Sequence, residues 1–515
     1  RVAPRLQADF PGLTITVLAA AEWAENPEAL CAARLAVDRA DLVIANLLFI
    51  EEHLTAILPW LQKARDRVDA FVGMVADPSV VKLTRMGDLD MSKPASGPMA
   101  LLKKLRGTKK PSASSGEKQM SMLRRLPKIL RWIPGKAQDL RAWFLSMQYW
   151  LGGSDENIEQ MIRFLISRYS TRKDWRGTEA KAPIDYPEVG LYHPDLAARM
   201  TTNLADLPRP AGTKATVGLL LLRSYILAGD TAHYDAVIRR FEAQGIACIP
   251  AFAGGLDGRP AINNFFQTAT GPRIDAMVSL TGFSLVGGPA YNDSPAAVEA
   301  LTALDLPYIA AHPLEFQTLG QWANAKTGLG PIETTMLIAL PEIDGATNPT
   351  VFSGRHGADG CKGCARACTG AAEAKAMAPC HERVEALADK VLRLALLRRR
   401  QVAERRVAIV LYGFPPNAGA VGTAAYLSVF ESLHNTLHAM KAAGHDLTPP
   451  ETVEELREAV LKGNAARYGQ VANVAAHVSA DVLVKDTPWL SEIEAVWGPA
   501  PGRHQTDGRG VFILG

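Results

Sequence analysis

The chain has 515 residues, of which 48% are apolar and 21% are charged, and its net charge is +3 at neutral pH. This length predicts two to four domains with apolar cores, and the small net charge argues against nucleic acid as a general partner. No apolar run approaches the roughly 18 residues that a membrane-spanning helix needs, so we predict a soluble, cytoplasmic protein without a transmembrane segment.

The first 90 residues alternate between strand-like and helix-like segments. Apolar, β-branched runs at Leu13–Leu18, Asp41–Phe49 and Ala70–Val75 read as strands, and Glu28–Arg39 has helical spacing. Strands separated by helices of this length indicate βαβ units and a parallel sheet. We therefore predict an N-terminal α/β domain over 1–90.

Residues 91–210 differ in character from those before them. They open with a basic stretch rich in Ser, Gly and Pro, for which a solvated loop is favoured over a binding arm. The following segment is helical and basic and contains Trp132, Trp143, Tyr149 and Trp150. We predict an amphipathic helical subdomain with these aromatics in its core. The alternative is a basic, aromatic surface that meets the carboxylates of a ligand or of a partner protein.

The clearest α/β pattern lies in 211–349. Helical segments separate four strand-like runs, at 216–222, 246–252, 274–280 and 308–311. The loops after parallel strands meet at one edge of the sheet, where open α/β sheets bind ligands. Residues 350–405 are predicted to be a cysteine-rich connector with a long, arginine-rich helix, and 406–515 to begin a further α/β domain, truncated at its end. The predicted fold class is thus multidomain α/β, with parallel-sheet βαβ domains and a helical basic subdomain between them.

Four of the six cysteines lie together in one segment: Cys361, Cys364, Cys368 and Cys380. Their spacing lets four thiolates surround one centre, and thiolates suit Zn²⁺ or an iron–sulfur cluster. We predict a metal centre here, with an iron–sulfur cluster favoured over zinc. The alternative is a set of reduced thiols in a flexible insert, since disulfides are disfavoured in a cytosolic protein.

Several long strings of the sequence resemble one known family, in the family's own order. They are MGDLDMSKPASGPMALLKKLRG (Met86–Gly107), AGGLDGRPAI (Ala253–Ile262), SLTGFSLVGGPA (Ser279–Ala290), ALPEIDGATNPTVFSGR (Ala339–Arg355), GFPPNAGAVGTAAYLSVF (Gly413–Phe430) and WGPAPGRHQTDGRGVFILG (Trp497–Gly515). On these strings the chain resembles the large (H) subunits of magnesium chelatase, within the cobaltochelatase large-subunit superfamily, over nearly its whole length. The cysteine cluster departs from the family's pattern.

The resemblance implies a porphyrin-binding subunit in the ATP-dependent insertion of Mg²⁺ into protoporphyrin IX, for (bacterio)chlorophyll synthesis. The chain contains no GxxxxGK[ST] string. The resemblance therefore implies that ATP is hydrolysed by separate motor subunits of the I and D type, and the downstream methyltransferase is a candidate partner. We expect the chain to be the N-terminal part of a longer polypeptide and inactive alone. The alternatives are a cobaltochelatase large subunit acting on a corrinoid, and a non-catalytic tetrapyrrole carrier or sensor.

Seven residues in the predicted loops are candidate contacts to the tetrapyrrole or to Mg²⁺. Carboxylates could replace water on Mg²⁺ or accept pyrrole protons, and histidines could bind the ion transiently or have a purely structural role. The candidates are His193, Asp257, Phe283, His312, Glu342, Phe414 and Asn417. We expect the main chelation residues to lie beyond Gly515, and the glycine-bearing loops after the strands of 214–345 and 407–443 to face a shared hollow.

Overall fold

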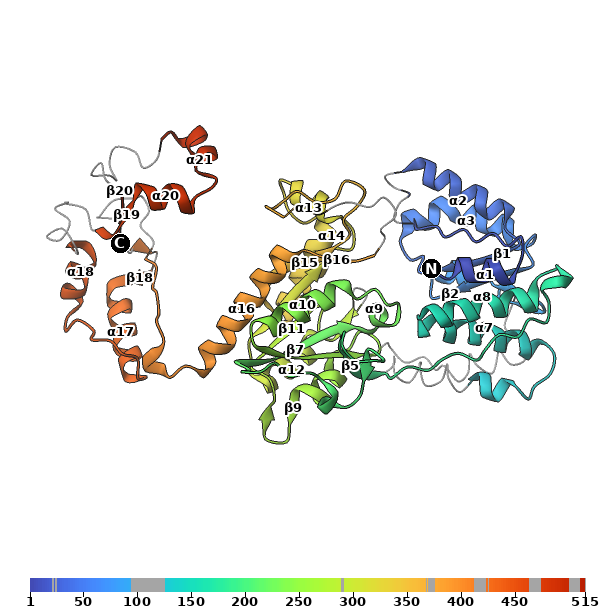
Figure 1. The fold of residues 1–515 in the computed structure, drawn as a ribbon, viewed down its shortest axis with the longest axis horizontal. Coiled ribbons are helices and arrows are strands. Elements are labelled where there is room, and N and C mark those ends of the chain that lie inside the picture. The colour runs from blue at the N-terminus through green and yellow to red at the C-terminus, as the bar shows by residue number, and fades with distance from the viewer. Residues whose placement is uncertain are drawn as a thin grey trace. The chain divides into compact units, whose positions relative to one another are not determined.

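A computed structural model of the chain describes most of the sequence. Its atomic contacts divide the chain into two units, 1–396 and 397–515, and each unit is described by itself (Figure 1). The domain boundaries predicted from the sequence stay predictions. The described residues are 1–20, 23, 26–93, 126–288, 291–366, 368, 376–411, 423–424, 426–462, 474–499 and 510–514.

The first unit begins with a small α/β sheet in the order β1-β2-β3-β4. Its strands are β1 (Leu42–Asn46), β2 (Ala70–Met74), β3 (Arg85–Met86) and β4 (Leu89–Asp90). Its helices are α1 (Ala3–Asp9), α2 (Pro27–Arg39), α3 (Glu51–Arg65) and α4 (Pro78–Val81). β1 and β2 are parallel and joined through α3, which confirms the predicted βαβ unit. α2 starts where it does because the Asn26 side chain accepts hydrogen bonds from the first free amides and Pro27 suits the first turn.

The run Leu13–Leu18 was predicted to be a strand and is not one. It has no regular secondary structure, and Val17 and Leu18 are exposed. An apolar, β-branched run becomes a strand only where a neighbouring strand can pair with it, and none of the described residues pairs with this run.

Two long helices, α7 (Lys136–Gly152) and α8 (Asp155–Tyr169), form the predicted helical segment. Gly153, at φ 62°, ends α7 in the left-handed region, and Ser154 caps α8. Their apolar faces share one core with β2. Trp143 donates a hydrogen bond to the Gly73 carbonyl (3.0 Å), and Tyr149 is buried, so these two aromatics are core residues as predicted. Trp132 was also predicted to be a core residue and is not, because it lies in the loop before α7, where its side chain is 82% exposed.

The central sheet has eight strands in the order β16-β15-β14-β11-β7-β8-β5-β6. They are β5 (Val189–Tyr192), β6 (Met200–Thr201), β7 (Ala215–Leu222), β8 (Ile246–Ala253), β11 (Ala276–Ser279), β14 (Tyr308–Pro313), β15 (Thr347–Gly354) and β16 (Ala378–Pro379). The five strands from β15 to β8 are parallel, and the edge strands β5, β6 and β16 are antiparallel to their neighbours. The four strands predicted for 211–349 are all present in this parallel array.

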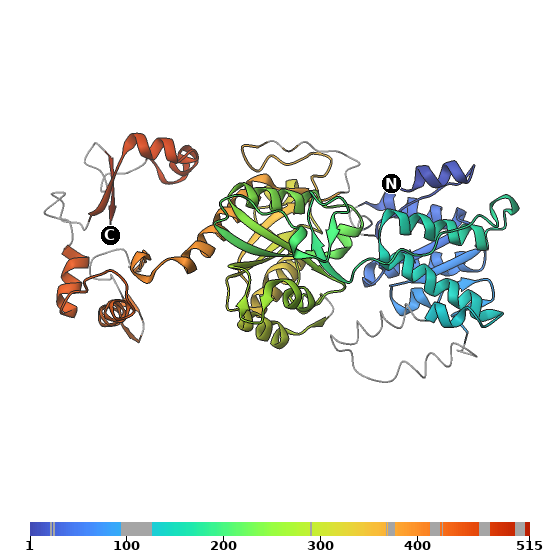
Figure 2. The ribbon, with the colours of Figure 1, turned by 60° about the horizontal axis from the view of Figure 1, so that its bottom comes forward.

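Helices cover both faces of this sheet (Figures 1 and 2). α10 (Ala232–Ala243) and α16 (His381–Arg399) pack on one face, while η4 (Ile262–Phe266) and α12 (Ser294–Leu304) pack on the other. The arginine-rich α16 therefore buries an apolar stripe against the sheet while its cations lie at the surface.

The remaining short elements are η2 (Lys173–Trp175), η3 (Leu204–Asp206), α9 (Arg223–Leu227), α11 (Arg259–Ala261), β9 (Gln267–Thr268), β10 (Gly271–Pro272), β12 (Gly287–Gly288), β13 (Tyr291–Asn292), α13 (Leu319–Asn324), α14 (Pro331–Glu333), η5 (Thr334–Ala339) and α15 (Leu340–Asp344).

The second unit carries little core among its described residues, where Leu456 is the buried apolar side chain. Its sheets are two-stranded and antiparallel, β17 with β18 and β19 with β20. Residues 407–411, predicted to be part of a strand, have no regular secondary structure. The elements are η6 (Val402–Glu404), β17 (Thr423–Ala424), β18 (Leu427–Ser428), α17 (Val429–Ala442), α18 (Val453–Lys462), β19 (Val474–Ser479), α20 (Ala480–Asp486), α21 (Leu490–Trp497) and β20 (Gly510–Leu514).

Candidate functional site

A pocket lies at the carboxyl edge of the central sheet, where the strand order reverses. After β7 the chain crosses one face through α10 to β8, whereas after β11 it crosses the other face through α12 to β14. Because β7 and β11 are neighbours, their following connections leave toward opposite faces and open a crevice, the usual ligand position in such sheets. The empty space at the pocket, including the open solvent at its mouth, is about 390 Å³.

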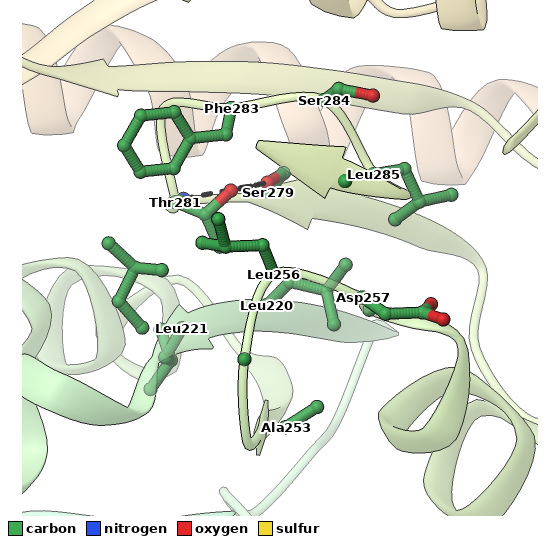
Figure 3. Close-up of a pocket in the computed structure, with 14 residues that line it drawn as sticks. Leu220, Leu221, Ala253, Leu256, Asp257, Ser279, Thr281, Phe283, Ser284 and Leu285 are labelled. Atoms are coloured by element: carbon green, nitrogen blue, oxygen red, sulfur yellow. Dashed lines mark hydrogen bonds between the residues drawn. The ribbon is translucent and has the colours of Figure 1, made fainter. Parts of the chain in front are cut away.

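The pocket is mostly apolar with a small polar strip (Figure 3). Leu220 and Leu221 come from the end of β7, and Leu256 and Phe283 come from the loops after β8 and β11. The Ser279 and Thr281 hydroxyls lie 2.9 Å apart in a hydrogen bond. This lining suits a largely apolar ligand that carries a few groups able to hydrogen-bond.

Asp257 and Phe283, two of the predicted contacts, both line this pocket. The Asp257 carboxylate is already engaged, because Arg259 Nε donates to its Oδ1 at 2.9 Å and Arg259 Nη2 to its Oδ2 at 2.7 Å. A carboxylate held by a guanidinium in this two-point manner has little capacity left for a cation. At the pocket, Asp257 therefore acts as one half of a neutral pair.

Asp344 holds the pocket loop in place through side-chain hydrogen bonds. It is 1% exposed, and its Oδ2 accepts a hydrogen bond from the Leu285 amide (2.9 Å) and one from the Ser284 hydroxyl. Its Oδ1 is buried without a hydrogen-bond partner among the described residues. Glu342, the acidic residue chosen from the sequence, is exposed on the same short helix and does not line the pocket.

The structure brings neither candidate histidine into the pocket lining. His193 follows β5, which is antiparallel to β8, and so it lies toward the opposite edge of the sheet. Both of its ring nitrogens are occupied: Nε2 lies 3.0 Å from a Glu242 carboxylate oxygen and Nδ1 accepts from the Asp195 amide. His312, in β14, is buried with no partner among the described residues on either nitrogen, and burial lowers its pKa to about 4.

Phe414 and Asn417 lie outside the described residues, as does most of the glycine-bearing loop at 413–422. Sequence reasoning missed the structural role of Asp344 at the pocket. An acidic side chain directly before Gly345, which ends α15 at φ 107°, was the available signal. This signal indicates the end of a helix, but it does not show whether Glu342 or Asp344 is the buried acidic residue.

Three of the clustered cysteines occupy one short hairpin. Cys361 and Cys368 exchange backbone hydrogen bonds of 3.0 and 3.1 Å. The thiols of Cys364 and Cys368 both donate to the Arg366 carbonyl, at 3.5 and 3.8 Å. The Gly363 amide in turn donates to the Cys361 sulfur at 3.5 Å.

Cys380 joins this hairpin through a small apolar cluster that also contains Cys361. Burial raises the pKa of Cys380 and of Cys368, and the other thiols of the group add to both shifts. All four thiols are free. Within the described ranges, no three His, Cys, Asp or Glu side chains are arranged to hold a metal ion. The metal centre predicted from the sequence stays a prediction.

Comparison with known proteins agrees with this architecture. Residues 147–515 match the protein family described as CobN/Magnesium Chelatase. The chain belongs to this family. Residues 1–144 match a second family, described as a domain of unknown function (DUF3479). Membership of the chelatase family, expected from the sequence strings, is confirmed.

Two curated relatives within the family match the whole chain, and both are H subunits of magnesium chelatase. The one from Cereibacter sphaeroides is 72% identical and the one from Rhodobacter capsulatus is 66% identical, and the chain spans 43% of the length of each. The solved catalytic subunit of cobaltochelatase from Mycobacterium tuberculosis is 20% identical, with a TM-score of 0.51 over 95% of this chain and 35% of that one. This likeness confirms the α/β fold class. Among the described helices, none is long and apolar enough to cross a bilayer.

Proposed function

We propose that this chain is part of the porphyrin-binding large subunit of a magnesium chelatase. In that role it takes part in the ATP-dependent insertion of Mg²⁺ into protoporphyrin IX, in (bacterio)chlorophyll synthesis in the cytoplasm. The observation that carries the proposal is 72% identity, along the whole chain, to a protein named as the H subunit of magnesium chelatase. Because the chain spans less than half of that relative, the insertion step is proposed for the longer protein.

The pocket at the carboxyl edge fits one edge of a tetrapyrrole. Mg²⁺ sheds water reluctantly, so a chelatase must hold the flat, apolar macrocycle still while oxygen or nitrogen ligands displace that water. The pocket encloses only a small space behind its open mouth, so it takes an edge of the ring system rather than all of it. Leu220, Leu256 and Phe283 would contact the apolar rim of the macrocycle.

Porphyrin titration of the full chain tests this proposal. With protoporphyrin IX followed by tryptophan quenching, Leu256→Asp should weaken binding at least tenfold (about 1.4 kcal/mol), because it places a carboxylate where apolar contact is expected. Leu397→Asp is the matched control, since both leucines are 46% exposed and Leu397 is not at the pocket. If the wild-type chain binds no porphyrin, the proposal fails. If both variants bind equally well, only the assignment of this pocket fails.

The partners are proposed on the same basis. The resemblance to H subunits implies separate I- and D-type ATPase subunits as the source of energy, and this chain itself contains no phosphate-binding GxxxxGK[ST] string. The downstream methyltransferase is the candidate receiver of the product. Both curated relatives described above bear the magnesium enzyme's name, so the magnesium reaction is favoured over the cobaltochelatase and carrier alternatives.

The clustered thiols support a second proposal, that Cys361, Cys364, Cys368 and Cys380 hold an iron–sulfur cluster or, second, Zn²⁺. Three of the cysteines lie in one hairpin, and the Gly363 amide donates to a cysteine sulfur, as amides do around bound thiolates. Iron, sulfide and zinc analysis of anaerobically purified protein tests this. Loss of bound metal in Cys364→Ser but not in Cys31→Ser, an exposed free cysteine elsewhere, is expected. A colourless protein without either metal contradicts it.

A further inference from the structure

A short projecting segment before α7 exposes large apolar side chains. We call residues 126–135 the Trp132 tip. They comprise one helical turn over 126–130 and the loop that leads into α7. Ile129 is 60% exposed, Trp132 82% and Ile133 41%. Single exposed apolar residues are ordinary, but three within five positions form a local apolar surface.

Side chains of α7 fix the backbone of the Trp132 tip through hydrogen bonds. Gln138 Nε2 donates to the carbonyls of Leu130 (2.9 Å) and Ile133 (2.6 Å), and Arg141 Nε donates to the Pro127 carbonyl (3.0 Å). Leu130 and Pro127, in the same segment, are buried. The apolar side chains are therefore presented by an ordered backbone, which lowers the entropy cost of binding.

The surroundings of the Trp132 tip are basic. Lys128 and Arg131 are exposed, and the Arg131 guanidinium lies 5.8 Å from the centre of the Trp132 ring. From Leu126 to Gln138 the sequence contains no acidic residue, and the preceding residues 101–125 contain eight Lys or Arg and one Glu. A surface that binds this tip must carry negative charge and an apolar layer into which the exposed side chains can insert.

We infer that the Trp132 tip docks the protein onto an anionic lipid surface. A stable protein interface needs about 800 Å² from each partner, and one projecting tip of three side chains does not provide that. The interfacial region of a bilayer accepts isolated Trp and Ile side chains, while anionic headgroups attract the flanking Lys and Arg. The contact is peripheral, because none of the described helices can span a membrane.

Sedimentation with vesicles tests the inference on the full chain. Binding is expected to vesicles of 70% phosphatidylcholine and 30% phosphatidylglycerol, and should fall severalfold in high salt, which screens the attraction. The double variant Trp132→Ser/Ile133→Ser should bind at least tenfold more weakly. Val496→Ser/Trp497→Ser, at side chains 76% and 84% exposed in the other unit, is the matched control.

Circular dichroism and porphyrin titration of the double variant should match wild type, because the Trp132 tip contributes nothing to the pocket lining. Wild-type vesicle binding by the double variant would overturn the inference, as would equal binding to pure phosphatidylcholine. Self-association that depends on Trp132 in the absence of lipid would assign the tip to a second copy of the chain instead, and would also overturn it.

Discussion

Asp344→Ala should lower the free energy of unfolding of the first unit by roughly 2–4 kcal/mol. The substitution removes the buried acceptor of the Leu285 amide and of the Ser284 hydroxyl. The amide then has no acceptor of its own and stays away from water, and an unsatisfied buried donor is more costly than a lost surface contact. Denaturant unfolding followed by circular dichroism, at constant m-value, measures the change.

Glu342→Ala is the matched control for that substitution. Glu342 lies in the same helix α15 and is exposed, so its replacement should change the unfolding free energy by less than about 0.5 kcal/mol. If the two variants are equally stable, the hydrogen bonds of Asp344 do not hold the pocket loop. The geometric explanation of the pocket would then be wrong.

His233→Leu should make the protein less sensitive to acid. His233 is fully buried among Tyr225, Tyr234 and Phe352, and neither of its ring nitrogens has a hydrogen-bond partner among the described residues. Burial lowers its pKa to about 3. In the unfolded chain the imidazole is protonated below about pH 6.5, whereas in the folded chain it stays neutral until about pH 3. Acid therefore favours the unfolded state from about pH 6.5 downward, and stability is lost as the pH falls.

Between about pH 6.5 and pH 4, wild type should therefore lose roughly 3 kcal/mol more stability than His233→Leu. At neutral pH the variant should be nearly as stable as wild type, because leucine has a similar volume and buries no polar atom. His381→Leu, at an exposed position, is the control for replacing a histidine. Parallel pH profiles for wild type and His233→Leu would show that this ring is not the buried neutral group described here.

Strands of the central sheet were predictable where an apolar run was long and bounded by turn residues. The predicted runs 216–222 and 246–252 agree with β7 and β8 to within one residue at each end. β5 and β15 were missed, because β5 is four residues long and β15 begins with polar, exposed positions. The run Leu13–Leu18 shows the opposite error, since its local character is strand-like but it has no pairing partner among the described residues.

The loops that form the candidate site could be predicted from the sequence, but most of the residues that line it could not. Glycine-bearing segments after parallel strands pointed to the correct edge of the sheet, and Asp257 and Phe283 do line the pocket there. His193 could not be placed from the sequence, because only pairing reveals that β5 runs antiparallel to β8. The inward position of Asp344 depends on how α15 packs, which no local pattern records.

The α/β class, the main parallel strands and the family could be predicted from the chain alone, because apolar periodicity, turn chemistry and long ordered strings are local properties of the chain. Three features became clear from the folded chain: β11 lies beside β7 and so opens the pocket, Arg259 pairs with Asp257, and Trp132 is exposed while Trp143 packs in the core. These features depend on contacts between segments far apart in the chain. Strand order and burial depend on which apolar surfaces pack against each other and exclude water. That packing involves several segments at once, so no single segment encodes it.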